Sequence, residues 1–216
     1  MLAGLFLALS CPTHADDAVP VPPPLLEFVK RPVQHDAVID SMSRAWSQIV
    51  GACDSVSIAD TRITLAGPIT FKTDGTPAAG QWMESTEVSG CGTKRRLNVL
   101  TVVAPDGRLM HVATLPGDTI ADPTLQRDSL YSVLAAAAPV VPEDCADTHL
   151  TDTKFVGFDG PPAKDTATGR PARPWHEQWT VVGCGKAALV TLHYAPDGDR
   201  MSIRAVPNET KSIKVK

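Results

Sequence analysis

The sequence is poor in two features that mark common functional classes. Only 5% of its 216 residues are aromatic, and 20 Lys and Arg face 24 Asp and Glu, for a formal net charge of -4. Nucleic-acid-binding domains normally carry a basic face, so this balance argues against a nucleic-acid partner. Because aromatic side chains supply much of the buried area of a core, their scarcity also means that the fold needs another source of stability.

Motifs for catalysis and cofactor binding are missing as well. The chain contains no G-x-S-x-G, H-E-x-x-H, P-loop or G-x-G-x-x-G pattern, the signatures of many hydrolases, metalloproteases and nucleotide-binding enzymes. Asp197-Gly198-Asp199 offers two calcium ligands without the remaining loop positions, which indicates a hairpin turn. We therefore expect no cofactor and no metal, and favour a non-enzymatic protein over an enzyme.

The N-terminus carries the features of an export signal. Its apolar run, residues 1–10, is shorter than the roughly 18 residues that span a bilayer, and small residues precede a cleavage point after Ala15. We predict a signal peptide over residues 1–15 and a periplasmic or secreted protein with no transmembrane span. Lipidation of Cys11 is a minor alternative. Residues 16–35 are expected to form an extended spacer, because four of the six residues 19–24 are proline.

An internal repeat dominates the rest of the chain. Residues 82–92 and 175–185 both read W-x-E-x-x-x-V-x-G-C-G, and each stretch leads to an Ala-Pro-Asp-Gly turn. We interpret the pattern as a tandem duplication, since self-similarity at a fixed offset is typical of repeated structural units. The predicted organisation is repeat unit 1 over residues 36–122, a linker over 123–127, repeat unit 2 over 128–210 and a basic tail over 211–216.

Each unit is predicted to hold one helix and four strands. Asp36 and Asp128 are suitable N-caps, and helical apolar spacing follows each of them. Four strand-like runs then alternate with turns, which predicts an antiparallel meander covered by the helix, an α+β arrangement. The helix faces expected to be buried comprise Val38, Ile39, Met42, Ala45, Trp46 and Ile49, and Leu130, Tyr131, Leu134, Ala137, Ala138 and Val141.

Four cysteines remain after signal cleavage, two in each unit at matching positions. In an exported chain such cysteines form disulfides, and of the three possible pairings the duplication favours Cys53–Cys91 with Cys145–Cys184. Closing each loop is worth about 3–4 kcal/mol. The alternatives are a reactive thiol in the Gly-Cys-Gly segment and a metal held by the four cysteines, although their spacing lacks the C-x2-C pairs of zinc sites.

The repeated Trp-x-Glu motif is the candidate binding site. Trp82 and Glu84, and likewise Trp175, Glu177 and Trp179, occupy alternate strand positions and so share one face. One interpretation is a ligand platform on which the indoles stack on a glycan or peptide while the carboxylate accepts hydrogen bonds. The other, which we favour, places these side chains in the core.

The pattern Trp175-x-Glu177-x-Trp179 with Cys184-Gly185 resembles uncharacterised secreted proteins of Gram-negative bacteria. This resemblance implies export and no particular activity; the first unit departs from it, with Thr86 where the second Trp would stand. The order of helix and strands also resembles cystatin-like architecture, at the level of fold alone. We expect a binding protein for a periplasmic protein or an envelope glycan. A structural accessory of the envelope and a hydrolase with an unrecognised site remain the alternatives.

Overall fold

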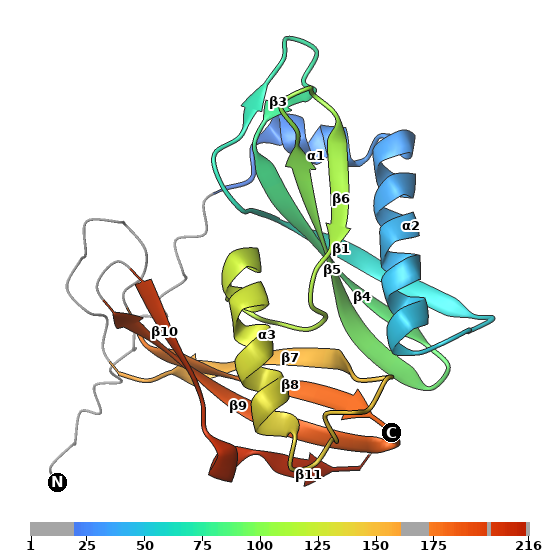
Figure 1. Ribbon diagram of the computed structural model, residues 1–216. Helices are drawn as coiled ribbons and strands as arrows, with labels where there is room; N and C mark the ends of the chain where they lie inside the picture. The colour runs from blue at the N-terminus through green and yellow to red at the C-terminus, as the bar shows by residue number, and fades with distance from the viewer. Residues whose placement is uncertain (1–19, 161–172, 198–199, 215–216) are drawn as a thin grey trace, which may run out of the picture.

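The computed structural model describes residues 20–160, 173–197 and 200–214. Over these residues it contains three α-helices, two antiparallel sheets of four and five strands and a small two-stranded sheet, with one disulfide in each half of the chain (Figure 1). The predicted α+β class is confirmed. No helix among the described residues is long and apolar enough to cross a membrane. The predicted signal peptide and Cys11 lie outside the described residues.

In the first half, helix α2 (Pro32–Ile49) covers a four-stranded sheet of order β1-β4-β5-β6. Its strands are β1 (Val56–Leu65), β4 (Gln81–Gly90), β5 (Thr93–Val103) and β6 (Leu109–Ala113). The core forms where one face of α2 meets the sheet and buries Val38, Met42 and Trp46. The connection between β1 and β4 carries the short strands β2 (Thr70–Phe71) and β3 (Pro77–Ala79).

The second half has the same order of helix and strands. Helix α3 (Pro123–Ala137) covers β7 (His149–Phe158), β8 (Trp175–Gly183), β9 (Lys186–Asp197) and β10 (Arg200–Ala205), which pair as an antiparallel meander. After the short helix η1 (Pro207–Glu209), strand β11 (Lys211–Ile213) also pairs with β9. Residues 211–213, predicted as part of a basic tail, are therefore a fifth strand of this sheet.

The predicted helix starts are wrong in both halves. Asp36 and Asp128 lie inside α2 and α3, which begin at Pro32 and Pro123. The true N-cap of α3 is Asp122, whose carboxylate accepts hydrogen bonds from the N–H groups of the second and third residues after it. Proline suits the first helical position because its missing N–H would have no partner there. The expected linker 123–127 is thus the first turn and a half of α3.

The prediction of an extended Pro-rich spacer is also wrong for most of residues 20–35, the part of it that the structure describes. Helix α1 (Pro23–Val29) begins within the proline run and buries Leu25, Phe28 and Val29, and α2 follows at Pro32. A proline pair at the start of a helix does not break it, since the first turn donates no intrahelical hydrogen bonds. Residues 23–35 are therefore part of the folded unit.

The buried face of α3 also differs from its prediction. Tyr131 is 84% exposed and Leu134 is 43% exposed, whereas Val133 is fully buried. Two polar side chains share the buried face: Ser129 Oγ lies 3.0 Å from the hydroxyl of Tyr194 on β9, and Gln126 Nε2 donates to the carbonyl of Ala121. These buried hydrogen bonds outweigh the simple apolar period because unpaired polar groups in a core are costly.

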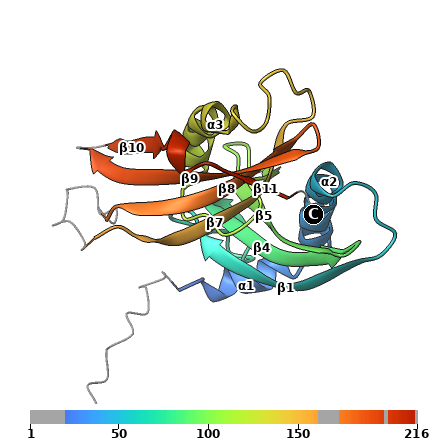
Figure 2. The ribbon, with the colours of Figure 1, turned by 90° about the horizontal axis from the view of Figure 1, so that it is seen from below.

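The connection between the halves, residues 114–121, is held by both sheets. Asn98 on β5 donates from Nδ2 to the carbonyls of Leu115 and Gly117. The backbone of Asp118 exchanges hydrogen bonds with Thr153 and Phe155 on β7. Figure 1 shows the chain passing from β6 to α3, and Figure 2 shows the strands of the second sheet above those of the first.

Candidate functional site

Both copies of the Trp-x-Glu motif lie in the core. Trp82 and Trp179 are fully buried, and Trp175, Glu84 and Glu177 are at most 6% exposed. The strand positions that carry them face the helix side of each sheet, where indole area is removed from water. The interpretation as an exposed ligand platform is therefore wrong for the described structure, and the interpretation as core residues holds.

The buried glutamates are hydrogen-bond acceptors for the indoles. Trp82 Nε1 donates to Glu84 Oε1 at 3.0 Å, and Trp175 Nε1 donates to Glu177 Oε1 at the same distance. Trp179 Nε1 donates to the second oxygen, Glu177 Oε2, at 2.8 Å. The motif thus pairs a large apolar side chain with the acceptor that its one polar atom requires when buried.

Each glutamate also ties the helix end of its unit to the sheet. Gln34 on α2 donates from Nε2 to Glu84 Oε1 at 3.2 Å, and the backbone N–H of Ile120 donates to Glu177 Oε1 at 3.0 Å. Burial raises the pKa of Glu84, and the hydrogen bonds from Trp82 and Gln34 oppose this rise. Such a group stabilises a fold without offering a surface to a ligand.

The two disulfides join the predicted cysteines, Cys53–Cys91 and Cys145–Cys184. Cys91 and Cys184 have φ of 47° and 49°, and the glycine after each also has a positive φ. Both hairpins therefore turn through two left-handed residues. The glycine before each cysteine leaves room for the bridge: a Cβ on Gly183 would lie 3.0 Å from Cys145 Sγ. The Gly-Cys-Gly segment is therefore a disulfide-bearing turn.

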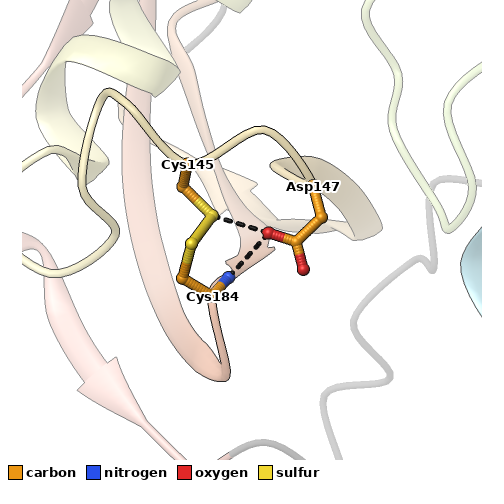
Figure 3. Close-up of side chains that lie close together, drawn as sticks. All are labelled: Cys145, Asp147 and Cys184. Atoms are coloured by element: carbon orange, nitrogen blue, oxygen red, sulfur yellow. Dashed lines mark hydrogen bonds between the residues drawn. A yellow bond between two sulfur atoms is a disulfide. The ribbon is translucent and has the colours of Figure 1, made fainter.

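Asp147 completes the environment of the second disulfide (Figure 3). Its Oδ1 accepts a hydrogen bond from the N–H of Cys184 at 2.9 Å and lies 2.6 Å from Cys145 Sγ. Cys145, Asp147 and Cys184 cluster tightly enough to suggest a metal site. Both sulfurs are bonded to each other, however, so neither is a free thiolate ligand.

In the first half, α1 covers the end of the sheet beside Trp82. The Phe28 ring meets the Trp82 ring edge to face, with centroids 6.0 Å apart. Leu25 and Val29 pack into the same cluster, which includes Leu65 and Leu109 from the neighbouring strands. This cluster is a groove of the sheet filled by a short helix of the same chain.

The second half has the corresponding positions on its strands. Leu65 pairs with Trp82 across the ladder, and Phe158 pairs with Trp175 in the same way. Trp82 pairs with Thr101, and Leu109 pairs with Val103, two residues further along β5. In the second sheet the matching pairs are Trp175 with Tyr194 and Met201 with Pro196.

The start of α3 borders these positions in the second half, and no counterpart of α1 lies over them among the described residues. Three of them, Phe158, Trp175 and Met201, line a groove of about 560 Å³ between the start of α3, the start of β8 and β10, which we call the Trp175 groove. Its lining residues are Ile120, Asp122, Thr124, Leu125, Asp128, Phe158, Arg173, Trp175, Arg200, Met201 and Ile203.

The Trp175 groove combines an apolar floor with charged groups of both signs. Trp175 stacks on Tyr194 with centroids 4.7 Å apart, which fixes its ring. Arg173 lies over the Phe158 ring, 4.3 Å from the centroid, and Phe158 is 37% exposed. An apolar groove with a few charges at its margin is suited to binding an amphipathic segment.

A second polar cluster lies on the other face of the same sheet. His176 and His193 are directly opposite each other on β8 and β9, and both contact the carboxylate of Asp159. We did not predict this cluster, although the Cys184-Gly185 turn contains the signal. A two-residue hairpin fixes the register of its strands, and counting outward from this turn pairs His176 with His193.

Comparisons with protein-family models, with curated proteins and with solved structures found no match for this chain.

Proposed function

We propose that this protein is an exported, non-enzymatic binding protein that docks a short apolar helix of a partner protein in the Trp175 groove. One observation carries the proposal: the chain fills the equivalent groove of its own first half with helix α1. The second half presents the same ladder positions with no such helix among the described residues. The two halves thus supply the filled and the open form of one kind of site.

The chemistry of the groove favours a protein segment over a glycan. Sugars are bound by exposed aromatic faces with polar groups around them, whereas Trp175 is only 6% exposed and stacked on Tyr194. The accessible lining consists largely of aliphatic and aromatic edges, including Leu125, Met201 and Ile203. Helix-in-groove recognition uses apolar anchors three or four residues apart, as Leu25 and Phe28 are spaced in α1.

The segment that connects β7 to β8 is not a suitable occupant of the groove. Residues 161–172, which connect β7 to β8, read P-P-A-K-D-T-A-T-G-R-P-A and contain no large apolar side chain. A segment without Leu, Ile, Val, Met or an aromatic residue cannot supply the anchors that α1 supplies in the first half. We therefore assign the groove to a partner.

The proposed location is the periplasm or the extracellular space. Two disulfides are consistent with an oxidising, extracytoplasmic compartment. The apolar N-terminal run and the resemblance to secreted Gram-negative proteins support removal of residues 1–15 as a signal peptide. The partner would then be a periplasmic or envelope protein with an accessible apolar helix.

A peptide copied from α1 is the sharpest available probe. Residues 20–31, made as a free peptide, are titrated by calorimetry into the chain beginning at Asp16. We expect saturable one-to-one binding below about 1 mM, and its loss when the Leu25 and Phe28 positions of the peptide are both alanine. Met201→Glu should abolish binding by placing a charge in the groove, whereas Met110→Glu, on an exposed position of the first half, should leave it unchanged.

Equal binding of the peptide to the wild-type chain and to the Met201→Glu variant would overturn the proposal, as would no binding at all. Circular dichroism of both variants shows whether they are folded. If Met201→Glu fails to fold, Ile203→Lys serves as the second groove variant, since Ile203 also lines the groove.

A further inference from the structure

The cluster on the face of the second sheet opposite α3 joins two imidazoles and two carboxylates. Because His176 and His193 are an opposed pair on antiparallel strands, their side chains leave the sheet side by side. Their rings lie 5.7 Å apart, centroid to centroid, with an angle of 26° between their planes. Two parallel imidazoles held this way can approach a common ion.

Asp159 lies between the two rings. Its Oδ1 is 2.7 Å from His176 Nδ1, and its Oδ2 is 3.5 Å from His193 Nδ1. The same nitrogen of each histidine therefore points at one carboxylate. Asp159 follows directly after β7, so three strands contribute to the convergence of the two nitrogens and the carboxylate.

Glu209 contacts His193 as carboxylates that orient metal-binding histidines do. Its Oε2 lies 2.9 Å from His193 Nε2, the ring nitrogen remote from Asp159. Histidines that bind metals commonly donate their other N–H to a carboxylate, which fixes the tautomer and leaves the first nitrogen free to coordinate. In this arrangement His193 Nδ1 is the coordinating atom.

We propose that His176 Nδ1, His193 Nδ1 and Asp159 bind a divalent transition-metal ion of the zinc type, with Glu209 as a positioning residue for His193. Imidazole together with carboxylate suits zinc and copper, whereas magnesium and calcium prefer oxygen ligands throughout. The ion would enter between the carboxylate and the two rings, so Asp159 gives up its direct contact with His176 Nδ1. Any ring nitrogen that carries a proton at the coordinating position releases it to solvent as the ion enters.

The cluster is accessible without unfolding. The histidine side chains are each 27% exposed, Asp159 is 37% exposed and Glu209 is 42% exposed. Three protein ligands leave a fourth position for water or for a donor atom of a partner. This site lies on the opposite face of the sheet from the Trp175 groove, so the two proposals stand or fall separately.

Calorimetry with ZnCl2 on a chain without an affinity tag tests the site. We expect one ion per chain, a still tighter complex with CuCl2, and no heat of binding with MgCl2. His176→Ala and His193→Ala should each weaken zinc binding more than tenfold, and Glu209→Gln should weaken it by about 10- to 100-fold without changing the stoichiometry. His149→Ala is the matched control, because the one side-chain hydrogen bond of His149 among the described residues is with the carbonyl of Asp147.

Absence of saturable zinc binding, or binding unchanged in His176→Ala and His193→Ala, overturns the proposal. Zinc-induced shifts of the imidazole resonances provide a second measurement that does not require the variants to fold. Shifts confined to His176 and His193 support the site, and shifts at His149 or His35 instead contradict it.

Discussion

Two glutamates at equivalent positions are used differently by the two halves. Both hydrogen bonds to Glu84, from Trp82 and Gln34, converge on Oε1. The bonds to Glu177 use both oxygens, because Trp179 reaches Oε2 while Trp175 reaches Oε1. A glutamine retains one acceptor oxygen and converts the other into a donor, so the same substitution should have unequal effects at the two positions.

We predict that Glu177→Gln lowers the free energy of unfolding by about 2–3 kcal/mol, because one buried indole N–H is left facing an amide NH2. Glu84→Gln should cost much less at neutral pH, since its carbonyl can accept both existing bonds. Urea unfolding of the two variants measures the difference. Equal costs would contradict the assignment of the two oxygens.

The raised pKa of Glu84 predicts a pH dependence with a definite sign. Since its folded pKa lies above the ordinary value of 4.5, the folded state binds the proton more tightly than the unfolded chain. This contribution to stability is fully present below pH 4.5 and is lost as pH rises through the folded pKa. Unfolding free energies of wild type and Glu84→Gln should therefore diverge over that window, with the wild type losing stability relative to the variant. A difference independent of pH would contradict the burial of Glu84.

The two cores distribute their large side chains between helix and sheet in opposite ways. In the first half α2 contributes Trp46 and Met42, and Thr86 stands at the strand position equivalent to Trp179. In the second half α3 buries alanines, and the strand contributes Trp179. This exchange explains why Thr86 interrupts the repeated motif without disturbing the fold.

At the scale of elements, α1 stabilises the first half by packing on the Trp82 end of its sheet. We predict that Leu25→Ala costs about 2–5 kcal/mol, because Leu25 is fully buried beside Trp82. Leu26→Ala is the matched control: its side chain is 38% exposed, and its cost should stay within about 0.5 kcal/mol. Thermal unfolding of the two variants distinguishes them. A similar shift for both would contradict the packing of α1.

The strands and disulfides were predictable because their signals are local and repeated. Alternating residues, the Ala-Pro-Asp-Gly turn at residues 104–107 and two matched cysteine pairs indicate the meander and the two bridges. The turn predicted at residues 195–198 is wrong in its position, because β9 continues through Asp197. Helix α1 was not predicted because its prolines suggested an extended segment. The start of α3 could have been predicted, since Asp122-Pro123 combines an N-cap residue with proline at the first helical position. The Trp175 groove could not be predicted, since it depends on which ladder positions remain uncovered once the chain is folded.

At the scale of the whole molecule, Gly117 joins the two sheets. Its φ is 102°, and a Cβ there would lie 2.0 Å from the carbonyl oxygen of Thr153 on β7. We predict that Gly117→Ala disrupts the contact between the halves and costs more than about 3 kcal/mol. Gly107→Ala, at a similar φ of 82° but in open space, should cost only about 1–2 kcal/mol of backbone strain. Denaturant unfolding compares them, and equal costs would contradict the close approach.

We propose a molecule in which one half is closed by its own helix and the other half binds a partner's helix at the corresponding surface. Nuclear magnetic resonance of the isotopically labelled chain with the α1 peptide tests this claim most directly. We predict chemical-shift changes at the indole N–H of Trp175 and at Phe158, Met201 and Ile203, with the signals of the Trp82 cluster unchanged. No shifts in the second half, or shifts confined to the Trp82 cluster, would contradict the account.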